Sequence, residues 1–120
     1  MRIGWLFACL AAAAATAPGG AEAAGRKPPD NPANDYLLRL PPEKQAEWLA
    51  HTVGGACIAT DPFPMGVATT GRAAGNAYWS FRCAGDGSYV VQIDRRGRGV
   101  TIDCETFNAN GGGKKCFEKI

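Results

Sequence analysis

The chain has 120 residues, a formal net charge of +2 at pH 7 and five cysteines. This charge is too small to indicate a nucleic-acid partner, and a chain of this length buries too little apolar surface to be secure without further support. No catalytic, metal-binding or nucleotide-binding motif stands out, so we expect a protein that is not an enzyme and needs no cofactor.

Residues 1–23 have the pattern of a cleaved signal peptide. Arg2 provides a basic start, and residues 3–15 form an apolar run that is shorter than the ~20 residues needed to cross a bilayer. An Ala-Glu-Ala sequence that ends at Ala23 is typical of the cleavage site, so we expect a periplasmic or secreted mature chain without a transmembrane segment. A lipid anchor on Cys9, which follows a loose lipoprotein-box sequence, is the alternative.

Proline and polar residues dominate residues 24–34, which predicts a flexible linker ahead of a small domain at residues 35–120. Pro42 suits a first helical turn and Gly54 suits a helix end, so we predict a helix over residues 42–53. Its apolar residues recur at helical spacing on one face. They are Ala46, Leu49, Ala50 and Val53.

Frequent proline and glycine between residues 57 and 76 predict a long loop rather than a regular element. Phe63 and Met65 lie in this segment, and we expect both side chains to turn inward. If they point outward instead, residues 61–75 form a loop that inserts into a hydrolase. A proteinaceous inhibitor is therefore one alternative for the function.

Three segments rich in aromatic and β-branched residues predict an antiparallel meander of strands at residues 77–83, 88–94 and 99–104. Every second residue then lies on one apolar face, which carries Trp79, Phe81, Cys83, Tyr89, Val91, Ile93, Val100, Ile102 and Cys104. The opposite, polar face carries Ser80, Arg82, Gln92, Asp94, Thr101 and Asp103. The predicted fold class is α+β, with the single amphipathic helix packed on the apolar face of the three-stranded sheet.

Four cysteines in the predicted mature chain indicate two disulfides formed in an oxidising compartment. Of the three possible connectivities, we prefer Cys57 with Cys83 and Cys104 with Cys116. Pairing Cys57 with Cys116 would require Cys83 to bond to Cys104. These two cysteines lie on the two outer strands of the predicted sheet, about 10 Å apart, which is too far for a disulfide. Four free thiols are the other alternative. We expect no metal site, because the chain has no Cys-x-x-Cys motif.

His51 is the only histidine and lies late in the predicted helix. It could act as a general acid or base, with Ser80 as a nucleophile, but a histidine near a helix C-terminus is also favourable through the helix dipole. The second explanation is simpler. A small enzyme that uses His51 is therefore a further alternative for the function.

Loops and polar faces of small stapled domains often carry their contacts with other molecules. The candidate interaction surface consists of Phe63, Met65, Tyr78, Arg82, Arg95, Arg96 and Arg98. The last three form a basic hairpin tip, and a second basic cluster contains Lys114, Lys115 and Lys119. We expect the two clusters at opposite ends of the sheet, where they cannot merge into one surface.

The series PPEKQAEWLA, PFPMGV, AYWSFRC, SYVVQI, DC and CF resembles small exported proteins of Gram-negative bacteria that have no assigned activity. The resemblance covers most of the predicted mature chain, and it implies an envelope location and a common fold. Together with the absence of catalytic motifs, it leads us to expect a monomeric binding or accessory module of the cell envelope. Its partner would be a protein or another envelope component.

Overall fold

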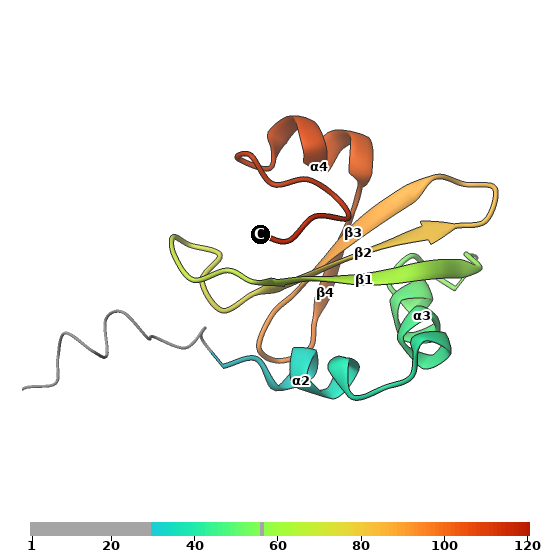
Figure 1. Cartoon of the computed structure of the whole chain (residues 1–120), viewed down its shortest axis with the longest axis horizontal. Helices are drawn as coiled ribbons and strands as arrows, with labels where there is room; N and C mark the ends of the chain where they lie inside the picture. The colour runs from blue at the N-terminus through green and yellow to red at the C-terminus, as the bar shows by residue number, and fades with distance from the viewer. Residues whose placement is uncertain (1–29, 56) are drawn as a thin grey trace, which may run out of the picture.

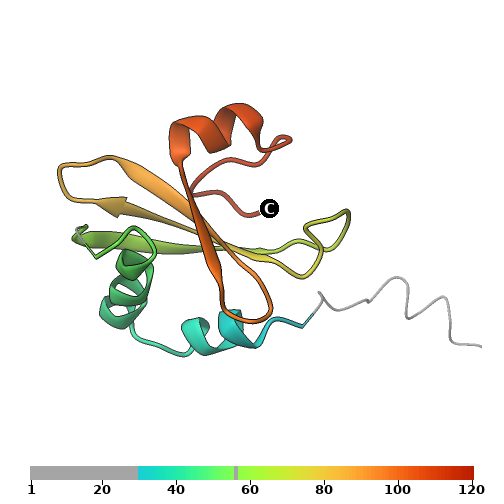
Figure 2. The same ribbon diagram turned by 180° about the vertical axis from the view of Figure 1, so that it is seen from behind.

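The computed structural model describes residues 30–55 and 57–120. Four strands form one antiparallel sheet in the order β1-β2-β3-β4, with α2 and α3 against one face and α4 on the other (Figure 1, Figure 2). The elements are α2 (Pro32–Leu38), α3 (Pro42–His51), β1 (Ala59–Val67), β2 (Ala77–Cys83), β3 (Ser88–Ile93), β4 (Gly99–Asp103) and α4 (Cys104–Asn110). The α+β class is confirmed, but the described residues form more elements than the expected single helix and three strands. The predicted signal peptide lies outside the described residues.

β1 occupies part of the segment that the sequence predicts as a loop. Pro62 and Pro64 lack the N–H group that a ladder needs, but β1 is an edge strand with a neighbour on one side only. Its register with β2 also shifts twice, next to Pro62 and next to Pro64, so the regular hydrogen-bond ladder is interrupted where the prolines lie. The loop prediction is therefore wrong for residues 59–67, and the irregular segment shrinks to the turn at residues 68–76.

The sheet has a hydrophobic core on each face. The helix-side core contains Leu37, Leu49, Ala77, Trp79, Phe81, Cys83, Val91 and Ile93. The α4-side core contains Met65, Ala68, Tyr78, Val90 and Phe107. The predicted apolar face is thus confirmed for the first two predicted strands, but the face that was expected to be polar is covered by a second apolar layer.

The register of β4 differs from the expected alternation. Val91 lies opposite Thr101, and Val90 lies opposite Ile102, so Ile102 joins the α4-side core rather than the helix-side core. Thr101 faces α3 instead, where its Oγ1 donates a hydrogen bond to the Thr52 carbonyl at 3.1 Å. The length of the β3–β4 turn sets which residues share a face, and counting along each strand separately does not reveal it.

α4 begins at Cys104, a residue that the sequence assigns to the third predicted strand. Asp103 caps this helix, because its side chain accepts a hydrogen bond from the Thr106 N–H at 2.9 Å. Phe107 is the buried residue of α4, and its ring centroid lies 6.0 Å from that of Tyr78. Val100, which was expected to be in the core, is exposed. α4 therefore covers the sheet face that the sequence leaves to solvent.

Among the described residues, the fold begins at Asn31, earlier than the expected start near residue 35. The Asn31 side chain caps α2 and donates hydrogen bonds to the carbonyls of Gly75 and Ile93, at 2.9 and 3.0 Å. Asn34 is also buried, and its Oδ1 accepts a hydrogen bond from the Trp79 indole N–H at 2.7 Å. Residues 31–34, assigned to the flexible linker, therefore belong to the domain, while residues 24–29 lie outside the described part of the chain.

The amphipathic helix predicted at residues 42–53 is present as α3, which ends at His51. Leu49 is its fully buried residue, and α3 packs mainly against β1. The chain leaves α3 through Gly54 and Gly55, which both have positive φ angles that suit glycine. No helix within residues 30–55 and 57–120 has the length and apolar character needed to cross a membrane.

Both preferred disulfides are present, Cys57–Cys83 and Cys104–Cys116. The first joins the segment after α3 to the end of β2, and the second joins the start of α4 to the C-terminal segment. Each disulfide therefore fastens the chain on a different face of the sheet.

Replacing Asn31 with alanine is expected to lower the free energy of unfolding by about 2–4 kcal/mol, because two buried carbonyls and the α2 N-cap lose their partner. Urea denaturation measures this loss. Asn110→Ala is the matched control, since that side chain is exposed and bonds only within its own helix. A loss below about 1 kcal/mol for Asn31→Ala would contradict the anchoring role of this residue.

Replacing Cys104 and Cys116 together with alanine is expected to cost about 3 kcal/mol, because the disulfide closes a short segment of the chain. Loosening should concentrate on α4 and Phe107, while Trp79 stays buried on the other face of the sheet. Amide hydrogen exchange of the double variant measures both regions. Equal loss of protection in α3 and α4 would contradict two separately fastened layers.

Candidate functional site

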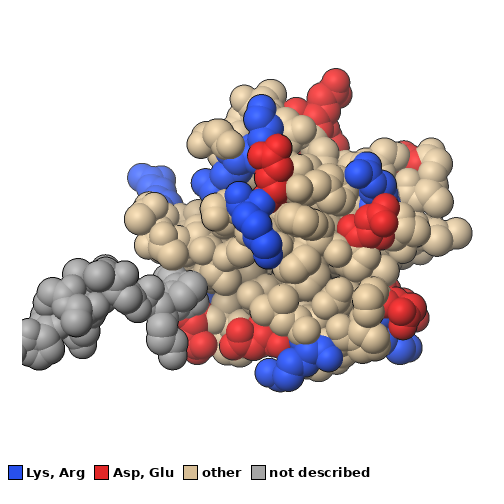
Figure 3. Space-filling model, viewed as in Figure 1, with Lys and Arg blue, Asp and Glu red and all other residues tan. Residues whose placement is uncertain are grey.

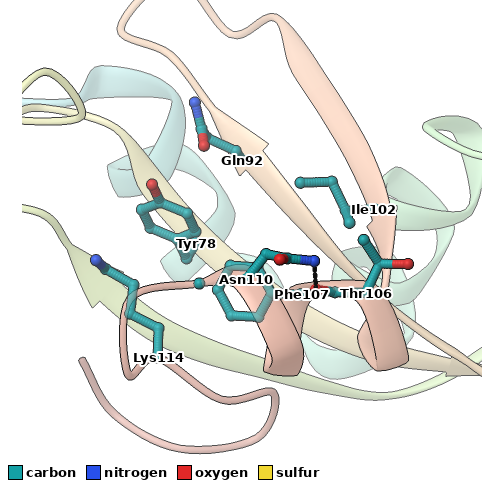
Figure 4. A pocket seen from close by; sticks show the side chains of 8 residues that line it. Tyr78, Gln92, Ile102, Thr106, Phe107, Asn110 and Lys114 are labelled. Atoms are coloured by element: carbon teal, nitrogen blue, oxygen red, sulfur yellow. Dashed lines mark hydrogen bonds between the residues drawn. The ribbon is translucent and has the colours of Figure 1, made fainter.

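A cleft of about 280 Å³ lies between α4 and the neighbouring face of the sheet. β2 and β3 supply Tyr78 and Gln92, and β4 supplies Ile102. α4 and the glycine-rich segment after it complete the wall, as Figure 4 shows. The residues from this part of the chain are Thr106, Phe107, Asn110, Gly111 and Lys114.

The turn after α4 brings Lys114 to the cleft. Lys114 N–H donates a hydrogen bond to the Gly111 carbonyl at 3.2 Å, which closes the turn. A side chain at Gly111 would place its Cβ 2.7 Å from the Phe107 carbonyl oxygen, a distance too short for a real contact. Glycine at this position therefore allows the chain to fold back so closely that Lys114 reaches the sheet.

Three polar groups in the cleft lack a hydrogen-bond partner within residues 30–55 and 57–120. They are the Tyr78 hydroxyl, the Gln92 side-chain amide and the Lys114 ammonium group. The other polar wall residues are engaged: Asn110 donates to the Thr106 carbonyl, and the Thr106 hydroxyl donates to Asp103 (Figure 4). The unpaired groups are therefore free to contact a bound molecule.

Tyr78 is the most constrained of these groups, since only 5% of its surface is exposed. Burial raises the pKa of its phenol above the ordinary value. The neutral hydroxyl can both donate and accept a hydrogen bond. A hydroxyl that opens onto a cleft, on a side chain that is otherwise buried, is well placed to select a ligand by hydrogen bonding.

A second cleft of about 210 Å³ adjoins the first and shares Lys114 with it. Its other walls come from residues 67–70 and from Ile120. No acidic side chain lines either cleft. Figure 3 shows Lys and Arg side chains gathered over the C-terminal segment and the turn after α4, around one acidic side chain. The surroundings therefore favour a ligand group that is neutral or negatively charged.

The sequence-predicted surface residues divide into buried and exposed ones. Met65 is fully buried and Tyr78 nearly so, which means that neither contributes an exposed side chain to a docking surface. Phe63 is half-buried and lies edge-on to Phe117, with ring centroids 6.2 Å apart. Arg82 is exposed, lies over the Phe117 ring and forms an ion pair with Asp61 at 3.2 Å. Phe63 and Arg82 thus pack on the C-terminal segment.

The three predicted arginines lie in the β3–β4 turn, which Asp94 organises. Asp94 Oδ1 accepts hydrogen bonds from the backbone N–H groups of Arg96 and Arg98, both at 2.9 Å. Its Oδ2 lies 3.2 Å from the Arg98 guanidinium Nε. The backbone N–H of Arg98 is the main cause that lowers the pKa of Asp94 below its ordinary value.

His51 and Ser80 lie on different faces of the sheet. His51 is exposed at the end of α3 and lines a hollow with Trp48, Thr52 and the β3–β4 turn. Ser80 is fully buried on the α4 side, where its hydroxyl donates to the Met65 sulfur and accepts from the Phe117 N–H. The structure therefore does not bring this predicted pair together.

Among the described residues, no group of three or more His, Cys, Asp and Glu side chains is placed to hold a metal ion. Comparison of the chain with protein-family models, with curated proteins and with solved structures found no match.

Sequence reasoning missed Asn110, Gln92 and Lys114 as neighbours in one cleft. Gln92 was placed on the polar face of the sheet, and Lys114 was placed in a basic cluster at the far end of the sheet from the arginines. One signal could have located α4, since Asp103 is a good N-cap residue and the glycines after Asn110 suit a helix end. No local signal indicates that this helix folds back over Tyr78.

Replacing Tyr78 with phenylalanine should leave the free energy of unfolding near pH 7 unchanged or slightly higher, because the lost hydroxyl has no protein partner. The raised pKa means that the contribution of this phenol is present below about pH 10 and is lost as the pH rises through the folded-state pKa. The variant should therefore lose less stability than the wild type at alkaline pH.

Urea denaturation at neutral and alkaline pH measures this difference. Tyr36→Phe is the control, since Tyr36 is exposed on α2. A large loss of stability in Tyr78→Phe at pH 7 would show that the hydroxyl has a structural partner.

Proposed function

We propose that the chain is a non-enzymatic binding module of the bacterial cell envelope, periplasmic or secreted, and that it holds its ligand in the cleft beneath α4. The proposal follows from the exposure and hydrogen bonding of the cleft residues, together with the disulfides and the leader-like sequence of residues 1–23.

The Tyr78 hydroxyl carries the proposal, because the side chain is only 5% exposed and its polar end opens into the cleft. A hydroxyl in such a recess forms its hydrogen bond either with water or with a bound ligand. Here the hydroxyl shares a cleft with the Gln92 amide and the Lys114 ammonium group, which are also unpaired within the described chain. A ligand with acceptor oxygens would satisfy all three groups together.

The apolar walls would hold the rest of the ligand. Phe107 and Ile102 lie beside the polar groups, so the cleft combines an apolar surface with a few directed hydrogen-bonding groups. Its volume suits a small group, such as one sugar or one amino-acid side chain, rather than a large cofactor. A carboxylate, amide or sugar hydroxyl beside a short apolar part matches these features.

The envelope location is supported by chemistry as well as by resemblance. Disulfides persist in the periplasm and outside the cell, whereas cytoplasmic thiols are kept reduced. Both disulfides here fasten parts of the fold that surround the sheet. The resemblance to small exported proteins of Gram-negative bacteria points to the same compartment.

The inhibitor hypothesis has less support in the structure than the cleft. It needs residues 61–75 as a protruding loop, but Asp61 to Val67 belong to β1 and Met65 is fully buried. Only the turn after Val67 is left to insert into another protein.

Nuclear magnetic resonance can test the cleft with small probes. Acetate, acetamide and N-acetylglucosamine, each titrated into the oxidised, ¹⁵N-labelled domain, are expected to shift the amide signals of Tyr78, Gln92 and Lys114. Tyr78→Phe should weaken binding of the best probe at least about fivefold, since one good hydrogen bond is worth about 1 kcal/mol.

Tyr36→Phe serves as the matched control and should bind like the wild type. Shifts that spread evenly over the surface, or probe binding that is identical in both variants, would sink the proposed site.

A further inference from the structure

The β1–β2 turn and the β3–β4 turn touch each other at one end of the sheet. The Asn31 side chain bridges them, because it bonds to the carbonyl of Gly75 in the first turn and to that of Ile93 just before the second. A Cβ atom built on Gly75 would lie 2.9 Å from the Arg95 Nε, so the arginine side chain packs directly on this glycine. Gly75 also has a φ of +94°, which suits glycine. These contacts fix the positions of the two turns relative to each other.

A hollow of about 200 Å³ lies between the two turns. Its walls are formed by Ala74, Asn76, Asp94, Arg95, Arg96 and Arg98. Three arginines and one asparagine thus contribute to the walls of one small hollow.

The single carboxylate in the hollow, that of Asp94, already has hydrogen-bond and ion-pair partners. Asp94 accepts backbone hydrogen bonds from the turn and pairs with Arg98. Within residues 30–55 and 57–120, neither Arg95 nor Arg96 lies within 4.0 Å of a carboxylate oxygen. Two guanidinium groups are therefore left to bind an external anion.

Other positive charges lie at the same end of the molecule. The turn at residues 68–76 lines the arginine hollow through Ala74 and the second α4 cleft through Thr69, where Lys114 also lies. Both views of the ribbon show the β1–β2 turn, the β3–β4 turn and the segment after α4 toward one end of the sheet (Figure 1, Figure 2). The expectation that the arginine and lysine clusters lie at opposite ends is therefore wrong.

We propose that the hollow between these turns binds a phosphate group. Guanidinium groups present paired N–H donors that match phosphate oxygens, and two or more arginines on the walls of one hollow favour a tetrahedral phosphate over a planar carboxylate. Arg95, held against Gly75, supplies a positioned donor, and Arg96 and the Asn76 amide supply the others. A free phosphate and the phosphate of an envelope phospholipid present the same recognition chemistry to the hollow.

Titration of the oxidised domain with inorganic phosphate, followed by the guanidinium Nε–H signals, tests the site directly. The Arg95 and Arg96 signals are expected to shift, and added sodium chloride should weaken the binding. Arg95→Gln combined with Arg96→Gln should weaken phosphate binding at least about tenfold.

Arg39→Gln combined with Lys44→Gln is the matched control, because it removes the same charge from exposed positions on the α2–α3 side. This control should bind phosphate like the wild type. Tyr78→Phe should also bind phosphate normally, which separates this site from the cleft beneath α4.

A second arm uses vesicles of phosphatidylcholine with and without phosphatidylglycerol. Selective binding to the anionic vesicles that disappears in the Arg95/Arg96 variant, together with phosphate binding, supports a lipid source. Phosphate binding without vesicle binding supports the site with a soluble source. No phosphate binding, or equal loss in both double variants, overturns the proposal, because general charge attraction then explains the result.

Discussion

β2 is buried on both faces, and the packing of every other element follows from this. Six of its seven residues are buried, so the strand needs an apolar layer above and below it. α2 and α3 cover Trp79 and Phe81 on one side, and α4 covers Tyr78 on the other. One disulfide on each side adds to the packing of that layer by restricting the unfolded chain.

Both candidate binding sites arise where these layers meet the turns of the sheet. α4 is short. It buries its own Phe107 against the sheet but leaves the Tyr78 hydroxyl at the open edge of the cleft. On the other face of the sheet, the Asn31 side chain donates hydrogen bonds to the Gly75 and Ile93 carbonyls. These bonds link the two turns that form the arginine hollow. A small domain thus obtains two recessed polar sites from the edges of its layers, and both lie toward the same basic end of the sheet.

Much of this architecture could be predicted from the sequence, because strong local signals mark it. The aromatic and β-branched segments located three of the four strands. The distance between outer strands argued against a Cys83–Cys104 disulfide, which agrees with the observed pairing. β1 was missed because Pro62 and Pro64 indicate a loop unless the strand is known to be an edge. α2 was missed because proline-rich composition outweighed the Asn31 cap. Which β4 side chains point toward α4 depends on the length of the β3–β4 turn, and the cleft depends on which distant segments cover the sheet. No local sequence pattern indicates either one.

One disulfide fastens each layer of the sheet. Peptide mapping of unreduced protein, isolated after export from a Gram-negative host, measures this pairing. We expect one cross-linked peptide pair that joins Cys57 to Cys83 and another that joins Cys104 to Cys116, with neither cysteine pair found reduced. Free thiols throughout, or peptides that join Cys57 to Cys116, would show that the layers are not fastened in this way.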